Sequence, residues 1–178
     1  MNFSLYRWDL ERLLQAISSQ DVHNVIQVLE QARDNHRVFI CGNGGSAALA
    51  SHFACDLAKS AGFAAMSLSD PMATLTAVAN DGGYCDIFSA QLAQQHCTPG
   101  DVLVAISVSG SSPNVVQALL CASGWGLRLV GLLGSDGGQA ARLCRARVIV
   151  PSPRYGLVED VHSAICHMIT EHFKETAR

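Results

Sequence analysis

The sequence predicts an α/β protein in which helices cover both faces of a parallel β-sheet. Short segments rich in Val, Ile and Leu alternate with segments whose apolar residues follow helical spacing, a pattern typical of right-handed βαβ crossovers. The apolar segments contain few polar residues, as expected of strands that are buried on both faces. The predicted strands are Val38–Cys41, Ala64–Leu68, Val102–Ser107, Leu127–Leu133 and Arg147–Val150.

Two amphipathic helices are predicted within residues 5–35, ahead of the first strand. The first has an apolar face with i, i+3, i+4, i+7 spacing, formed by Leu10, Leu13, Leu14 and Ile17. A similar apolar pattern begins at Val22 after a polar break, where Ser19 or Asp21 is expected to cap the second helix.

The remaining helices are expected between the strands and after the last one. Two of them lie together between the second and third strands, and the last follows the final strand; helices are expected on both faces of the sheet. The predicted helices are Ser46–Lys59, Met72–Ala79, Asp86–Gln95, Asn114–Ala122, Gln139–Cys144 and Leu157–Lys174.

Length and composition indicate one domain with a substantial core. The chain has 178 residues, of which 49% are hydrophobic and 15% charged, values that suit a compact α/β subunit. We expect a single domain over residues 1–178, with N-terminal helices in residues 1–35 and an α/β core in residues 36–178. No internal repeat or long linker interrupts it.

Charge and hydropathy exclude several classes of partner. The net charge is −3 and the pI about 6.1, so no overall basic field attracts nucleic acid. The apolar runs are shorter than the ~20 residues of a membrane span. Acidic residues occupy the N-terminal stretch where a signal peptide has its apolar segment. We therefore expect a cytoplasmic protein without membrane or nucleic-acid partners.

The cysteines favour a reducing compartment. Their number is odd, no CxxC pair occurs, and most lie among apolar residues, where a free Cys packs as a small hydrophobe. A disulfide framework and a zinc–thiolate site are both disfavoured. The cysteines are Cys41, Cys55, Cys85, Cys97, Cys121, Cys144 and Cys166.

The stretch Arg37–Asp56 combines a phosphate-type turn with chemically active side chains. A predicted strand ends in the glycine-rich turn 42–46, and a helix begins there, an arrangement that binds phosphate. On that helix, His52 and Asp56 are spaced i, i+4 and share one face. Taken alone, such a pair is more often a solvated pair or a core histidine with its partner than part of a functional site.

Three further polar loops follow predicted strands, where ligands of parallel sheets bind. The most informative is 107–112, which holds four serines and a glycine directly before Pro113, a residue suited to the first helical turn. Backbone N–H groups and hydroxyls of this serine loop can surround a phosphate without Lys or Arg. The alternative is an ordinary serine-rich turn. The other two loops are 69–70 and 134–138.

The last predicted helix carries a second cluster of titratable residues. Glu159, Asp160, His162 and His167 lie within little more than two turns. With His52 and Asp56 they could form a zinc site or a general acid and base, provided that the two helices meet in space. Asn80 and Asp81 precede two glycines, which an ordinary helix C-cap would also explain.

These motifs resemble the sugar isomerase (SIS) domain family, and within it the phosphoheptose isomerases. The resemblance extends over nearly the whole chain, and the motifs occur in family order. They are CGNGGS (41–46), HF-x-x-D (52–56), AVANDGGYCDIFS (77–89), GDVLVAISVSGSSPNV (100–115) and E-D-x-H-x-x-x-x-H (159–167).

The resemblance implies a fold and an assembly. The fold would be a three-layer sandwich with a five-stranded, flavodoxin-like parallel sheet and additional N-terminal helices. Those helices would build a homotetramer with active sites at the subunit interfaces. The implied reaction is an aldose–ketose isomerisation of sedoheptulose 7-phosphate to D-glycero-D-manno-heptose 7-phosphate through an enediol.

The resemblance also implies roles for individual residues. Asn43, Gly44, Gly45 and Ser46 would contact substrate. Sugar hydroxyls would bind Asn80 and Asp81, and the phosphate would bind Ser107, Ser109 and Ser112. The zinc and catalytic positions would be His52, Asp56, Glu159 and His167, with one Zn²⁺ in each active site, a carboxylate as base and a histidine as acid.

The chain departs from the family pattern at two of these positions. The family normally has Glu where Asp56 stands and Gln where Glu159 stands. Asp is shorter by one methylene, and the base could be either Asp56 or Glu159. The alternative function is a non-catalytic SIS protein that binds a phosphosugar or a replication initiator. Such proteins tend to lose the metal and catalytic residues that this chain retains.

Overall fold

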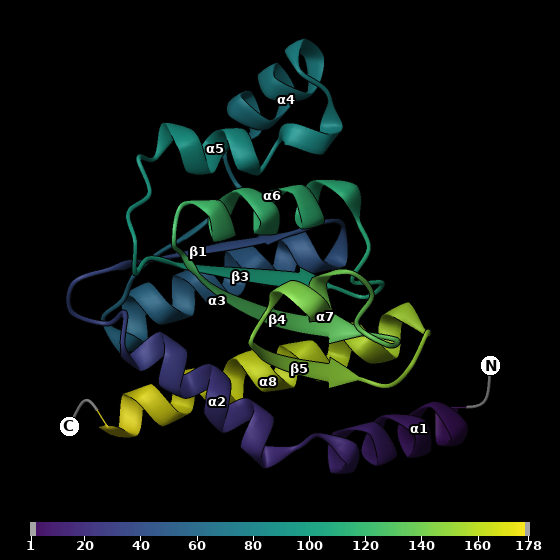
Figure 1. Cartoon of the computed structure of the whole chain (residues 1–178). Helices are drawn as coiled ribbons and strands as arrows, with labels where there is room; N and C mark the ends of the chain where they lie inside the picture. Colours follow the sequence, from purple (N-terminus) through teal and green to yellow (C-terminus); the bar gives the residue numbers. More distant parts are fainter. Residues whose placement is uncertain (1–2, 177–178) are drawn as a thin grey trace.

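A computed structural model describes residues 3–176 and shows a five-stranded parallel sheet between two layers of helices (Figure 1). The strand order is β2-β1-β3-β4-β5, and every neighbouring pair is parallel. The predicted fold class is therefore confirmed, with all five strands within two residues of their expected ends. The strands are β1 (Arg37–Gly42), β2 (Ala64–Ser67), β3 (Val102–Ser107), β4 (Arg128–Gly134) and β5 (Ala146–Val150).

The N-terminal segment forms two helices, α1 (Phe3–Ala16) and α2 (Ser19–Glu30). Ser18 caps α2, because its hydroxyl accepts a hydrogen bond of 3.2 Å from the backbone N–H of Asp21. The prediction of Ser19 or Asp21 as the cap was wrong by one to three positions, since each of several adjacent residues has a side chain that can cap.

The other helices also agree with the prediction, with one exception. In place of the predicted helix 86–95, a single 3₁₀ turn, η1 (Tyr84–Asp86), is followed by a short helix. Gly83, with a positive φ of 108°, directly precedes η1. The helices are α3 (Gly45–Ala61), α4 (Met72–Asp81), α5 (Ser89–Gln94), α6 (Pro113–Gly124), α7 (Ala140–Leu143) and α8 (Tyr155–Thr176).

Alternate residues of the central strands form two cores, one on each face of the sheet. Ile40 and Val104 point to the face covered by α2, α3 and α8, whereas Phe39 and Leu103 point to the face covered by α5, α6 and α7. All four side chains are fully buried. This explains why the strands are apolar at nearly every position.

Both tryptophans lie at the surface of the chain. Trp8 is 55% exposed and Trp125 is 38% exposed, so neither belongs to the core. Among residues 3–176, no helix has the length and apolar character that crossing a membrane requires.

A buried carboxylate joins three segments at the amino ends of the strands. Asp101 accepts hydrogen bonds from the Arg37 backbone N–H at 2.8 Å, the Thr98 backbone N–H at 2.9 Å and the Arg37 guanidinium at 3.0 Å. Burial alone would raise the pKa of Asp101, but these hydrogen bonds outweigh it and hold the pKa below the ordinary value.

We expect Asp101→Asn to lower the free energy of unfolding by about 2 kcal/mol at neutral pH, because charged hydrogen bonds are replaced and one donor loses its acceptor. A lowered pKa in the folded state stabilises the fold above the unfolded pKa of about 3.9, and this contribution is lost as the pH falls through the folded pKa. Urea unfolding at a series of pH values measures the difference. Asp34→Asn, at an exposed carboxylate, is the control. If the difference in unfolding free energy between wild type and Asp101→Asn stayed the same down to about pH 3, Asp101 would not be ionised in the folded protein as proposed.

Candidate functional site

The predicted substrate-binding residues from two loops and one helix meet at the carboxyl ends of β1 and β3. They line a small cavity of about 60 Å³, here called the serine cavity. Glu159 of α8 and Tyr155 from the start of that helix close its third side. The predicted residues that line it are Asn43, Ser46, Ser107, Ser109, Ser112 and Glu159.

Glycines in the 42–46 turn allow close approaches that any side chain would prevent. A Cβ on Gly42 would lie 2.6 Å from the Ser46 carbonyl oxygen, and Gly44 has a positive φ of 57°. A Cβ on Gly45 would lie 2.5 Å from Glu159 Oε1. The turn thus makes space for the Glu159 carboxylate at the beginning of α3.

Asn43 is held in one orientation by two residues that sequence reasoning missed. Its amide forms a reciprocal pair with the Asn114 amide, each N–H donating to the other oxygen at 2.9 Å. The Tyr84 hydroxyl also donates to Asn43 Oδ1 at 2.9 Å. A buried Asn in the otherwise apolar start of α6 was the signal for Asn114, whereas no local pattern pointed to Tyr84.

The serine loop presents hydroxyl groups that can bind an anion. The Ser107 and Ser109 oxygens accept hydrogen bonds from the backbone N–H groups of Gly110 and Ser111 at 3.1 and 3.2 Å, which leaves both O–H groups free to donate. Ser112 is the N-cap residue of α6, and its side chain makes no capping hydrogen bond. The loop therefore combines hydroxyl donors with a helix N-terminus, where anions are stabilised.

The loop after β4 supports the serine loop from behind. A Cβ on Gly110 would lie 2.0 Å from the Gly137 carbonyl oxygen, and the Ala140 backbone N–H donates to the Gly110 carbonyl at 2.8 Å. The predicted ligand loop 134–138 thus packs against the serine loop and does not line its cavity.

Two helices bring His52, Asp56 and His167 together. His52 Nε2 lies 3.1 Å from Asp56 Oδ2 and 3.5 Å from His167 Nε2, and one ligand atom from each residue lies within 4.8 Å of the others. A single N–H at His52 Nε2 cannot donate hydrogen bonds to both Asp56 and His167, so hydrogen bonding alone does not explain this arrangement. Two ligands at about 2.0–2.1 Å from a tetrahedral ion are about 3.3 Å apart, so the spacing and donor types fit a divalent metal.

Glu159 lies between the serine cavity and these three residues. It lines the serine cavity, and it also lines a second cavity of about 280 Å³ together with His52, Gly45 and Ser163. Its carboxylate does not belong to the group within 4.8 Å, which contains three of the four predicted metal ligands.

The other polar residues of α8 lie apart from this group. Asp160 accepts a hydrogen bond of 2.6 Å from the Tyr6 hydroxyl of α1. His162 is fully buried, and burial lowers its pKa to about 4, so the ring is neutral at pH 7. Arg154, which precedes α8, forms an ion pair with Asp9.

Asn80 and Asp81 lie at the exposed C-terminal end of α4, outside the serine cavity. Asn80 Nδ2 donates to Asp81 Oδ1 at 2.8 Å. A largely apolar cavity of about 210 Å³ lies between α4 and the glycine turn, and Asn43 and Tyr84 line it. The α4 region therefore borders the site without entering its polar part.

Comparisons with known proteins agree with this geometry. The family model described as "SIS domain" matches residues 6–134. A phosphoheptose isomerase of Rhodospirillum rubrum is 41% identical over 147 residues, which cover 80% of this chain and 78% of the relative. One from Helicobacter pylori is 38% identical over 174 residues, covering 95% of this chain and 90% of the relative.

A solved structure extends the agreement to three dimensions. The phosphoheptose isomerase of Neisseria gonorrhoeae superposes with a TM-score of 0.87 at 30% identity, covering 97% of this chain and 95% of that one. The resemblance predicted from the motifs is confirmed. This chain belongs to the SIS domain family and, within it, to the phosphoheptose isomerases.

Proposed function

We propose that this protein is an aldose–ketose isomerase that converts sedoheptulose 7-phosphate to D-glycero-D-manno-heptose 7-phosphate through an enediol. The observation that carries this proposal is the position of Glu159, which lines both the serine cavity and the cavity beside His52. The Glu159 carboxylate therefore lies between the proposed phosphate site and the proposed metal ligand His52. The relatives at 36–41% identity are named for the same reaction.

The serine loop is the proposed phosphate site. The hydroxyl groups of Ser107, Ser109 and Ser112 would donate hydrogen bonds to the phosphate oxygens. Ser46 and the N-terminus of α6 lie beside them. The fixed amide of Asn43, next to Gly44 and Gly45, would orient the sugar. Asn80 and Asp81, exposed at the end of α4, are the proposed partners of hydroxyls farther along the sugar.

We assign zinc binding to His52, Asp56 and His167, whose donor atoms and spacing suit it. When bound, Zn²⁺ supplies a Lewis acid that polarises a substrate oxygen. The three side chains come from only two helices, α3 and α8, which pack against each other. The relative position of these helices therefore decides whether the group forms.

We assign the proton transfer between carbons to Glu159. Asp56 is in contact with His52, whereas Glu159 lines both the serine cavity and the cavity of about 280 Å³ beside it. A sugar whose phosphate is bound at the serine loop would extend into this second cavity. Glu159 would remove a proton from C1 of the ketose and return it to C2. The C2 oxygen gains a proton and the C1 hydroxyl loses one in the same conversion, so the atoms balance.

The non-catalytic alternative is not favoured. A protein that only bound a phosphosugar or a replication initiator would need neither the convergent His52, Asp56 and His167 nor a carboxylate beside them. The seven cysteines are all free, which suits the proposed cytoplasmic location.

Two substitutions separate the proposed roles. We expect Glu159→Gln to bind zinc as wild type does but to lose turnover by about 10²–10⁴-fold, the usual contribution of a general base. Asp56→Asn should lose zinc as well as turnover, because an anionic ligand is removed. Metal analysis after dialysis and NMR detection of the heptose product measure the two properties.

Glu171→Gln, an exposed position on the same helix, is the control and should match wild type. Turnover by Glu159→Gln at the wild-type rate would transfer the role of base to Asp56. No product from folded, zinc-loaded wild type would reject the heptose substrate.

We also propose that the protein is a homotetramer, built through the N-terminal helices, with active sites at subunit interfaces. The α1 helix exposes large apolar side chains, including Phe3 at 91% and Trp8 at 55%. Farther along the chain, Leu14, Ile17 and Met168 line an open groove of about 330 Å³ between the N-terminal helices and α8. Exposed apolar area of this kind is typical of a surface covered in an assembly.

The double substitution Trp8→Ser and Leu14→Ser is expected to reduce the assembly to smaller species, because it removes apolar area from the proposed interface. Light scattering after size-exclusion chromatography measures the mass. Leu120→Ser, at an exposed leucine on the opposite helical layer, should leave the mass unchanged. A tetramer that survives the double substitution would place the interface elsewhere.

A further inference from the structure

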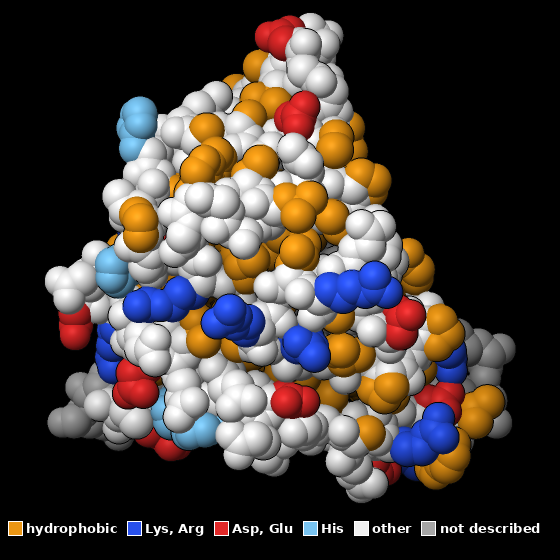
Figure 2. All heavy atoms as spheres, in the orientation of Figure 1, with side chains coloured by type: hydrophobic (Ala, Val, Ile, Leu, Met, Phe, Trp, Pro, Cys, Tyr) orange, Lys and Arg blue, Asp and Glu red, His pale blue; other side chains and the backbone are white. Residues whose placement is uncertain are grey.

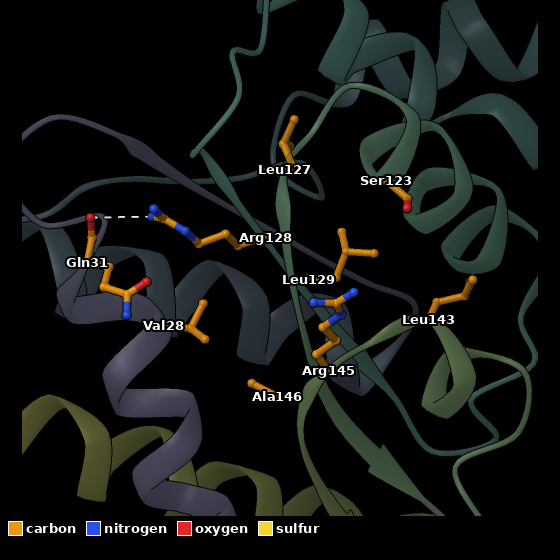
Figure 3. A pocket seen from close by; sticks show the side chains of 9 residues that line it. All are labelled: Val28, Gln31, Ser123, Leu127, Arg128, Leu129, Leu143, Arg145 and Ala146. Carbon is orange, nitrogen blue, oxygen red and sulfur yellow. Dashed lines mark hydrogen bonds between the residues drawn. The ribbon is translucent and has the colours of Figure 1, made fainter.

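A separate cavity lies at the amino ends of β4 and β5, the sheet edge opposite the serine cavity (Figure 3). Its volume is about 460 Å³, within the range of small-molecule sites. The end of α2, the end of α6 and the segment between α7 and β5 enclose it. Its lining consists of Val28, Gln31, Ser123, Leu127, Arg128, Leu129, Leu143, Arg145 and Ala146.

Two arginines give this cavity an uncompensated positive charge. Within residues 3–176, neither Arg128 nor Arg145 has a carboxylate within 4.0 Å. The contacts of the Arg128 guanidinium are neutral: it donates to the carbonyls of Gly100 at 3.1 Å and Gln31 at 3.4 Å. None of the nine described residues that line the cavity is acidic.

The charge is concentrated locally in a chain that is acidic overall. Arg142 and Arg147 lie close to Arg145 in the sequence and are exposed as well. Figure 2 shows a row of Lys and Arg side chains across the middle of the face on which Figure 1 is drawn. Since the net charge is −3, this grouping is not a consequence of composition.

The remaining walls suit an organic rather than an inorganic anion. Leu127 is buried and Leu129 and Leu143 are half-buried, so these leucines form an apolar wall of the cavity. The Arg128 guanidinium points away from this wall, toward Gln31 (Figure 3). Gln31 and Ser123 add hydrogen-bonding groups at the rim. Guanidinium groups bind phosphate through paired N–H groups and stack on flat rings.

We propose that this cavity, here called the arginine cavity, binds a phosphorylated small molecule with an aromatic group, of which a mononucleotide is the simplest example. The phosphate would bind the Arg145 guanidinium and the ring would lie against the leucines, while Arg128 adds positive charge from the side of Val28 and Gln31. Because the cavity is at the opposite sheet edge, its occupant and a sugar phosphate in the serine cavity can bind together.

Isothermal titration with AMP tests the proposal, with adenosine and inorganic phosphate as partial ligands. AMP should bind more tightly than either. Arg145→Ala and, independently, Ser123→Glu should weaken AMP binding by about tenfold or more, since one removes a charged hydrogen-bonding partner and the other adds a repelling charge. Both positions are exposed, so the fold should be retained, which thermal unfolding checks.

Arg7→Ala removes one exposed positive charge far along the sequence and should leave AMP binding unchanged. An excess of sedoheptulose 7-phosphate should not displace AMP. Displacement by the sugar phosphate, or AMP affinity unaffected by Arg145→Ala, would overturn the proposal. So would folded wild type that does not bind AMP, or RNA that competes with AMP and binds more tightly as its length grows. These readouts do not depend on turnover, so they are separate from the test of isomerase activity.

Discussion

The pairing of β1 with β3 is the constraint on which the rest of the structure depends. Polar contacts fix this pairing at both ends: Asp101 binds Arg37 at the amino end, and Asn43 pairs with Asn114 just past the carboxyl end. Because a shift of one residue would turn every side chain to the opposite face, both cores and both polar contacts would be lost together. The glycine turn therefore faces the serine loop in one arrangement, and the serine cavity forms between them.

The two family departures are linked through this arrangement. Asp56 is shorter than the glutamate of the family pattern, yet it reaches His52 at 3.1 Å because both lie on one face of α3. Glu159 carries a charge where the family has a neutral amide, and Gly45 leaves room for that carboxylate. The chain therefore has a carboxylate on both helices at these positions, whereas the family pattern has one on α3 alone. This arrangement agrees with the proposed roles of Asp56 in binding metal and of Glu159 in moving a proton.

The fold could be predicted from the sequence because its signals are local. Strands buried on both faces, glycine turns and helical spacing are properties of short segments, and all five strands follow them. The directions of individual side chains could not be predicted in the same way. His162 and His167 occur on one helix, but the first packs into the core while the second faces His52. Asp160 binds Tyr6, more than 150 positions earlier, and Tyr84 reaches Asn43 from a different layer. Such contacts depend on how the helices pack.

The two proposed anion sites, at opposite edges of the sheet, differ in their charge. The proposed phosphate site in the serine cavity has neutral hydroxyl donors and lies beside the Glu159 carboxylate. An arginine in the same place would form an ion pair with that carboxylate, which is the proposed base. None of the described residues that line the arginine cavity is acidic, so no carboxylate of the lining competes with an anion for the guanidinium groups. The arginines are thus separated from the proposed base by the full length of the strands, which is compatible with the proposed proton transfer at one edge and the proposed anion binding at the other.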